Sequence, residues 1–312
     1  MFENSRIKRL RYKTAIKLRK VSFPGFDKVP VYDVVVFFWN GLYNGAVSLR
    51  ASSIAFSFFL ALFPAIIFLF TLIPYIPIDN FQVELLKLLE NFMPVDAYKV
   101  IQTTIEDIAM HKRGSLLSFG FAAALIFATN GVAAMISAFN ATALTFESRT
   151  WIWQRIISVF LVLIQTVLIT IAIGLLVSSQ KLFDYLLTLE WLEKNLLFYL
   201  LQIGHWIIIV ALFFFAISFL YYLAPSKKTK WRFISPGGTL ATILMVITSI
   251  GFSFYINNFG QYNKLYGSLG TLIVVLLWLY FNSFVLIIGF ELNASINNAF
   301  LKKDGHFLFK KL

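Results

Sequence analysis

Six long apolar stretches dominate the 312-residue sequence and limit the folds that it can adopt. They cover about residues 51–74, 115–139, 155–179, 200–223, 233–257 and 269–290. A helix that crosses the hydrocarbon core of a bilayer needs about 20 mostly apolar residues, because each residue rises 1.5 Å. Hydrophobic residues make up 59% of the chain and charged residues only 13%, a balance that one water-soluble core cannot bury. The sequence therefore predicts an all-α, polytopic membrane protein with six transmembrane helices.

Lysine and arginine are spread unevenly over the segments that connect these stretches. Alternate segments, counted from the N-terminal tail, hold 20 of the 27 basic residues, and the other segments hold 7. Because basic residues are retained on the cytoplasmic side of a membrane, both termini are predicted to lie in the cytoplasm. The net charge of +12 is then explained by orientation and by contact with anionic lipid. We therefore expect membrane lipid, and no nucleic acid, as a partner.

The membrane domain is expected to cover residues 31–298, between two basic cytoplasmic tails at 1–30 and 299–312. Its first segment, 31–48, mixes aromatic and aliphatic residues with Asp33 and two asparagines. This composition is typical of an amphipathic helix that lies in the membrane interface.

A second amphipathic segment, residues 79–111, separates the first two apolar stretches and holds six of the fifteen acidic residues. Its helical periodicity is interrupted at Met93-Pro94, which predicts a pair of helices on the outer side of the membrane. Two interpretations stay open for this outer cap. It is either a solvated cover or a surface at which a substrate enters or an envelope protein docks.

Polar side chains occur at membrane depth in several of the apolar stretches. Asn130, Gln165, His205 and Asn282 are the main examples. Such residues are costly in lipid and face the interior of a bundle or a wet cavity, but each can also serve only as a hydrogen-bonding link between helices. As a set over four stretches, they favour a shared polar interior.

Pro64 and Glu291 stand out within the first and last apolar stretches. Proline removes a backbone hydrogen bond, so Pro64 predicts a kink or a point of conformational change. Glu291 forms a polar stripe with Asn293 and should seek a basic partner, with Arg50 and Arg149 at the same membrane level. Glu291 is interpreted either as half of a structural ion pair or as a proton or cation site.

The connection FGQYNKLYGSLG at residues 259–270 carries more polar and aromatic residues than a simple turn requires. Tyrosine suits the membrane interface, and glycine allows tight turning. The segment is predicted to be a re-entrant or cavity-lining loop. The full set of candidate residues for a substrate path or gate is Pro64, Asn130, Asn140, Gln165, His205, Tyr255, Tyr262, Tyr266, Gly267, Asn282, Glu291 and Asn293.

Motifs for catalysis are missing from the sequence. The chain has no cysteine, and its three histidines have no acid at metal-ligand spacing. The sequon Asn140-Ala141-Thr142 is a chance match, because it falls on the predicted cytoplasmic side. We therefore expect no catalytic residues, no metal and no cofactor, and a protein that is not an enzyme.

Four blocks of the sequence, within about residues 35–298, resemble one family of membrane proteins. They are SIAFSFFLALFPAIIF, GVAAMISAFN, YYLAPSKKTKWRFISPGGTLAT and SFYINNFGQYNKLYGSLGTLIVVLLWLYFNSFVLIIGFELNA. These blocks are similar to the YihY/virulence factor BrkB family, once labelled ribonuclease BN. After Asn140 the sequence ATALTFES departs from the basic and aromatic residues expected in that family. The resemblance implies a bacterial inner-membrane protein with six spans and both termini inside.

The resemblance also implies a role in transport or in the integrity of the cell envelope. Our first hypothesis is a transporter or flippase-like protein for an amphiphilic or lipid-linked substrate. The alternative is a structural or scaffolding envelope protein. A tRNA-processing ribonuclease is disfavoured, because the sequence holds no His-x-His-x-Asp-His cluster and its cytoplasmic turns are short.

Overall fold

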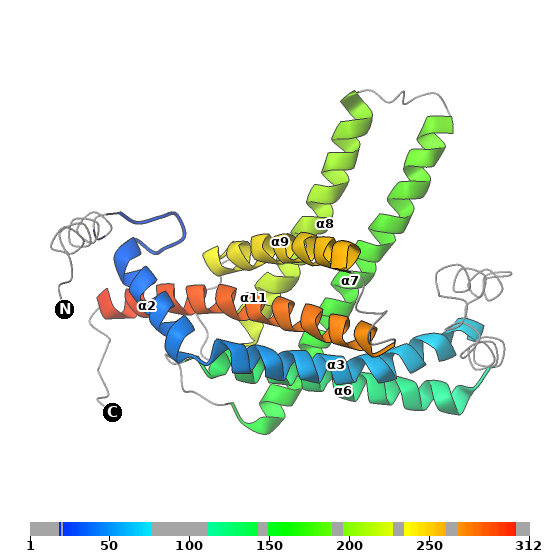
Figure 1. Ribbon diagram of the computed structural model, residues 1–312, viewed down its shortest axis with the longest axis horizontal. Helices are drawn as coiled ribbons and strands as arrows, with labels where there is room; N and C mark the ends of the chain where they lie inside the picture. Colours follow the sequence, from blue (N-terminus) through cyan, green and yellow to red (C-terminus); the bar gives the residue numbers. More distant parts are fainter. Residues whose placement is uncertain are drawn as a thin grey trace. The chain divides into compact units, whose positions relative to one another are not determined.

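The computed structural model describes Arg19 and residues 21–75, 112–142, 149–188, 196–226, 234–259 and 268–303, and these residues form helices, turns and no strand (Figure 1). The predicted outer cap at 79–111 lies outside this set, as do Tyr262, Tyr266 and Gly267 of the predicted loop.

Six helices in the described residues are long and apolar enough to cross a membrane, which confirms the predicted all-α class with six apolar helices. They are α3 (Val47–Leu72), α6 (Gly114–Asn140), α7 (Trp151–Thr188), α8 (Leu196–Leu223), α9 (Pro236–Phe259) and α11 (Ser268–Lys303). A seventh helix, α2 (Val31–Asn44), is about 21 Å long at 1.5 Å per residue and is too short to cross the bilayer. The 3-10 helix η1 (Ile73–Tyr75) follows α3.

Several helix ends differ from the ends of the apolar stretches. The predicted helix 31–48 is divided by a turn at Gly45 and Ala46, so that α3 begins at Val47 rather than at residue 51. Helix α11 continues past residue 290 to Lys303, so residues 299–303 of the predicted tail are helical. Hydropathy marks only the part of a helix that faces lipid, whereas the backbone hydrogen bonds of a helix continue beyond the membrane.

The described helices form two compact units, and α3 and α6 each contribute to both. The smaller unit, residues 55–131, is built from the remainder of α3, η1 and the first part of α6. Glycines allow this pair of helices to approach closely: a methyl group placed on Gly120 would lie 3.2 Å from the Cα atom of Phe68, and one on Gly131 would lie 3.0 Å from the ring of Phe58. The rings of Phe68 and Phe121 also meet, with centroids 5.5 Å apart.

In the larger unit, α11 packs against both α2 and α9, and α8 packs against α7 and α9. The start of α9 is defined by its sequence, SPGG. Ser235 caps the helix, because its Oγ accepts a hydrogen bond from Gly238 N at 3.0 Å, and Pro236 occupies the first helical position, where its missing N–H costs nothing. Asn293 of α11 adds a second cap, since its Oδ1 accepts from Gly237 N at 2.8 Å.

The N-terminal segment packs onto the last part of α11. Val29 and Val34 are buried against Ile296 and Ala299, which lie beyond the apolar stretch of α11. The opposite face of α2 is exposed, with Trp39 67% and Tyr43 84% accessible. One face of α2 therefore packs within the unit, and the other face presents exposed aromatic side chains.

Candidate functional site

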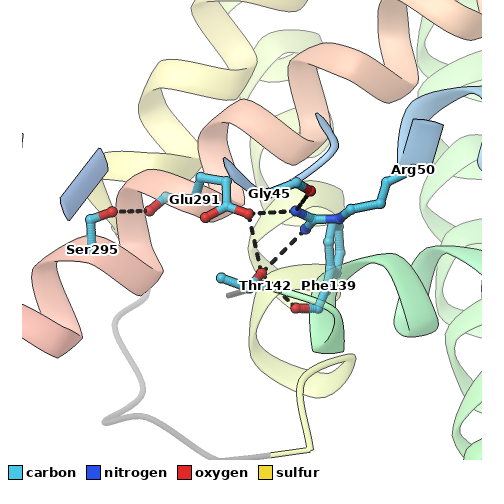
Figure 2. A network of polar contacts seen from close by, with 6 residues as sticks. All are labelled: Gly45, Arg50, Phe139, Thr142, Glu291 and Ser295. Carbon is cyan, nitrogen blue, oxygen red and sulfur yellow. Dashed lines mark hydrogen bonds and ion pairs between the residues drawn. The ribbon is translucent and has the colours of Figure 1, made fainter. Parts of the chain in front are cut away.

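A buried ion pair joins the first and the last of the six apolar helices within the larger unit. Arg50, in the first turn of α3, donates from Nη1 to Oε1 of Glu291 in α11 at 2.6 Å, and the two side chains are 8% and 0% exposed (Figure 2). The structure therefore selects Arg50, rather than Arg149, from the two basic partners predicted for Glu291. Among the charged residues whose side-chain burial the structure describes, Arg50 and Glu291 are the two that are buried.

The end of α6 completes this arrangement through Thr142. Arg50 Nη2 donates to Thr142 Oγ1 at 3.2 Å, while the same hydroxyl lies 2.8 Å from the carbonyl oxygen of Phe139 and 3.3 Å from Glu291 Oε1. A hydroxyl has one proton, so Thr142 can donate to only one of these two acceptors at a time. Arg50 Nη1 also donates to the carbonyl oxygen of Gly45 at 3.0 Å, beyond the end of α2.

Two polar atoms of the pair have no hydrogen-bond partner within the described part of the chain. They are Arg50 Nε and Glu291 Oε2, both fully enclosed. In Figure 2, Oε2 is the carboxylate oxygen that points away from the guanidinium group. An unsatisfied polar atom in a buried position costs about 1–3 kcal/mol, and more when the group is charged. The carboxylate thus accepts a hydrogen bond from Arg50 through Oε1, while Oε2 is enclosed without a hydrogen-bond partner.

Glycines of α2 and of the following turn make room for this network. A methyl group on Gly41 would lie 2.7 Å from Glu291 Oε2, closer than side chains can approach. One on Gly45 would lie 3.3 Å from Arg50 Nη1 and 2.2 Å from the carbonyl oxygen of Gly41. The turn also places Ala46 at φ 47°, in the left-handed region that non-glycine residues rarely adopt. The ion pair therefore depends on a backbone arrangement as well as on two charges.

An aromatic cluster closes the site beside Glu291. Phe290 stacks on Phe139 with ring centroids 4.4 Å apart, and Tyr221 of α8 meets both rings edge-on. Tyr221 Oη donates to the carbonyl oxygen of Leu286, one turn before Phe290, at 2.6 Å. Apolar walls of this kind lower the local dielectric, which strengthens the attraction between Arg50 and Glu291 and also raises the cost of separating them.

The remaining basic candidate, Arg149, has a different role in the structure. It donates from Nη1 to the carbonyl oxygens of Leu223 and Ala224, at 3.1 and 3.5 Å, and from Nη2 to that of Pro225. Burial lowers the pKa of Arg149, but an arginine remains charged at any physiological pH. Its cation thus satisfies the exposed carbonyls at the end of α8, where the helix dipole is negative.

Two of the predicted site residues bind backbone groups at helix ends near this region. Asn140 Oδ1 accepts a hydrogen bond from Ser226 N at 2.8 Å, which links the end of α6 to the turn after α8. Asn293 binds Gly237 N and also donates from Nδ2 to Ser235 Oγ at 3.0 Å. Although Asn293 is two residues from Glu291, it serves the start of α9 and makes none of the contacts of the ion pair.

Other predicted residues contact nearby helices or their own helix. Gln165 of α7 donates to the carbonyl oxygen of Ala216 in α8 at 2.9 Å, and Asn282 donates to that of Trp278 in its own helix at 2.8 Å. The Gln165 contact is the predicted hydrogen-bonding link between two helices, whereas the Asn282 contact stays within α11.

The last four described candidates are the half-buried Pro64, Asn130, His205 and Tyr255. Pro64 is inside α3, which continues to Leu72, and Asn130 lies in the smaller unit. The ring of His205 meets that of Trp206, and the ring of Tyr255 meets that of Phe252. None of these contacts involves the ion pair.

Sequence reasoning missed the residues that surround the pair. Thr142 was noticed only as part of a chance sequon, and Gly41, Gly45 and Tyr221 were not considered. A signal for Gly41 was present, because a glycine inside a helix lowers helix propensity and often has a packing reason. Within the described ranges, no three His, Cys, Asp or Glu side chains are grouped so as to hold a metal ion.

Comparison with known proteins agrees with this architecture. The family model for virulence factor BrkB matches residues 38–307. The ribonuclease-like protein YfkH of Bacillus subtilis is 32% identical over 80% of this chain and 89% of its own length. A UPF0761 membrane protein of Tolumonas auensis is 25% identical over 83% of this chain and 84% of its own.

A UPF0761 membrane protein of Xanthomonas campestris pv. campestris is 26% identical over 84% of this chain, which spans 60% of that relative's length. No solved structure matches the chain. Because the family model covers most of the sequence, including all six apolar helices, the chain belongs to the virulence factor BrkB family of membrane proteins.

Proposed function

We propose that this chain moves an amphiphilic or lipid-linked substrate across the bacterial inner membrane, in the maintenance of the cell envelope. In this proposal both termini lie in the cytoplasm, as the distribution of basic residues suggests. The observation that carries the proposal is the buried pair of Arg50 and Glu291, held between α3 and α11. Ionisable residues inside membrane helices are costly and mark substrate or ion pathways.

The energetics of buried ion pairs support a functional reason for this one. Replacing a buried pair with well-packed apolar residues is often neutral or stabilising by about 1–4 kcal/mol. A buried pair in which Glu291 Oε2 and Arg50 Nε are enclosed and unsatisfied is thus not explained by stability alone. If the helices move between two arrangements, Oε2 and Nε can find hydrogen-bond partners in the second arrangement that they lack in this one.

The polar groups at depth favour an amphiphile over a hydrophilic solute. Gln165 and Asn282 are already bonded to backbone carbonyls, so these side chains are engaged within the protein. An amphiphile keeps its apolar part in lipid and needs polar contacts only for its head group. Arg50 is in the first turn of α3, and Glu291 lies in α11 beyond its most apolar part, so the head group of an amphiphile could meet both side chains at this level.

Reconstitution tests the proposal directly. Purified protein in liposomes that contain fluorescent head-group-labelled or chain-labelled lipids should accelerate exchange between leaflets, measured by chemical quenching of the outer leaflet. The panel should include zwitterionic, anionic and polyprenyl-phosphate lipids. Liposomes with an equal amount of an unrelated six-helix protein are the control. Folded protein that moves none of these lipids faster than the control would refute the proposal.

The orientation has its own test, which does not depend on transport. Fusion of a reporter that is active only in the cytoplasm, or only in the periplasm, to the C-terminus reports its side of the membrane. We expect cytoplasmic activity. A periplasmic C-terminus would refute the proposed topology.

The described residues lend less support to the other functions considered. A scaffolding role would depend on the outer cap at 79–111, which lies outside them, and recovery of one envelope protein by crosslinking from that cap would favour it. The ribonuclease-like name of the Bacillus relative finds no support in the described residues, which offer no group of metal-binding side chains. We propose a protein that is not an enzyme, and incubation with precursor tRNA and Mg²⁺ should leave the RNA intact.

A further inference from the structure

We propose that Oε2 of Glu291 is a proton-binding site and that the proton bound there drives the transport cycle by releasing Arg50. This inference rests on the proposed transport function and names its energy source. It starts from the asymmetry of the carboxylate. Oε1 accepts from Arg50 and lies beside the hydroxyl of Thr142, whereas Oε2 has no hydrogen-bond partner although Glu291 is 0% exposed.

The surroundings of Oε2 suit a proton rather than a metal ion. Its neighbour is Gly41 of α2, where even one added carbon atom would lie only 2.7 Å away. Biological cations such as Mg²⁺ and Ca²⁺ need several oxygen ligands at about 2.0–2.6 Å. Among the described residues, no three His, Cys, Asp or Glu side chains are grouped so as to supply such ligands. A proton needs one lone pair, which Oε2 has.

Proton binding and the ion pair are coupled by charge. With Glu291 ionised, the pair carries no net charge. Addition of H⁺ to Oε2 makes the carboxyl neutral and leaves the Arg50 cation buried without a counter-ion. Arg50 keeps its own proton, so the one chemical change is the new O–H bond at Oε2. An uncompensated buried cation is strongly unfavourable, and the protonated state therefore favours an arrangement in which Arg50 leaves the site.

Other charged groups do not compensate for this change. The described parts of α6 and α9 contain no charged side chain. Tyr221 of α8 donates its hydroxyl to the carbonyl oxygen of Leu286. Asp33 of α2 faces Lys302 at 3.8 Å, at the other end of the contact between α2 and α11. Among the groups described around Glu291, Arg50 is thus the charge that responds to protonation.

Release of Arg50 would also free contacts on three elements at once. Arg50 binds Gly45 beyond the end of α2, Thr142 beyond the end of α6, and Glu291 in α11. One protonation event therefore acts on the connections of several helices. This is the property that a coupling ion needs in order to change which side of a membrane a substrate can reach.

Infrared difference spectroscopy tests the proton site without any transport assay. Acidification of the purified protein should produce a carbonyl band of a protonated, buried carboxyl group. That band should be absent in Glu291→Gln and shifted in position in Glu291→Asp, which keeps an acid at the site. Asp33→Asn removes an acid from the same pair of helices and should leave the band unchanged. If no such band forms, or if it persists in Glu291→Gln, the proton site is refuted.

A transport measurement tests the coupling separately. In liposomes, an imposed pH gradient should accelerate lipid movement several-fold by the wild-type protein and by Asp33→Asn, and should have no effect on Glu291→Gln. If the rate of lipid movement by the wild-type protein does not change with the pH gradient, this inference is overturned and the proposed function is left intact. Absence of any lipid movement would instead refute the proposed function, and the infrared result would still decide whether Glu291 binds a proton.

Discussion

Replacement of Gly289 in α11 with alanine adds only one methyl group, but it should weaken the contact between α9 and α11 strongly. The added methyl group would lie 2.6 Å from the carbonyl oxygen of Gly237, 2.6 Å from Tyr221 Oη and 2.7 Å from Cβ of Ala241. Two of these three atoms belong to backbone or Cβ positions, which cannot move without moving a helix. The same substitution at Gly237, on the facing helix α9, meets the same obstacle, because its methyl group would lie 2.1 Å from the carbonyl oxygen of Gly289.

The expected loss of unfolding free energy in Gly289→Ala has two parts. Overpacking of a well-packed site costs about 1–3 kcal/mol, and the involvement of backbone atoms places this case toward the upper end. The methyl group also displaces Tyr221 Oη, which donates to the carbonyl oxygen of Leu286 at 2.6 Å, and a lost hydrogen bond costs about 1 kcal/mol. We therefore expect the Gly289→Ala variant to lose about 3–4 kcal/mol of unfolding free energy.

Reversible unfolding in mixed micelles, followed by circular dichroism, measures this loss. Gly251→Ala is the matched control, because it adds the same atoms within α9 where nothing lies within 4 Å. The control should be neutral or more stable by up to about 1 kcal/mol, since alanine favours the helix over glycine. If Gly289→Ala is as stable as Gly251→Ala, the close crossing of α9 and α11 is wrong.

Three further substitutions test local features by the same unfolding measurement. Tyr221→Phe removes the hydrogen bond to Leu286 and keeps the ring, so we expect a loss of about 1 kcal/mol, whereas unchanged stability would mean that this bond contributes nothing. Ala46→Gly relieves a φ of 47° and should be neutral or stabilising by up to about 1 kcal/mol, while Ala46→Val should destabilise; equal effects would contradict the left-handed turn. Ser235→Ala removes the cap on Gly238 N and should cost about 1 kcal/mol, and Ser235→Asp, which restores an acceptor, should recover most of it.

Hydropathy and charge were enough to predict the class of fold. Runs of about 20 apolar residues have few alternatives to a membrane helix, because no other element satisfies its own backbone in lipid. The ends of the helices were harder to predict, as α11 shows: its extension past residue 290 is stabilised by packing of Val34 and Val29 on Ile296, which a sliding window does not detect.

The candidate site could be predicted only in part. Glu291 is conspicuous as an acid in an apolar context, and membrane level alone reduced its partners to Arg50 and Arg149. The choice between them depended on tertiary contacts, because Arg149 is committed to the carbonyl groups at the end of α8. Thr142 carries no local signal, since a threonine near a helix end is common. Its role depends on spatial contacts with Arg50 and Glu291, which are far from it in the sequence.

The separation of Arg50 and Glu291 in the chain has a consequence for biosynthesis. They are 241 residues apart, so a ribosome that adds about 5–20 residues per second needs roughly 10–50 s to make the second after the first. Throughout this interval Glu291 does not yet exist, and water and lipid head groups are available to solvate the arginine. The ion pair between the first and the last apolar helix can therefore form only after α11 has been made, late in the synthesis of the chain.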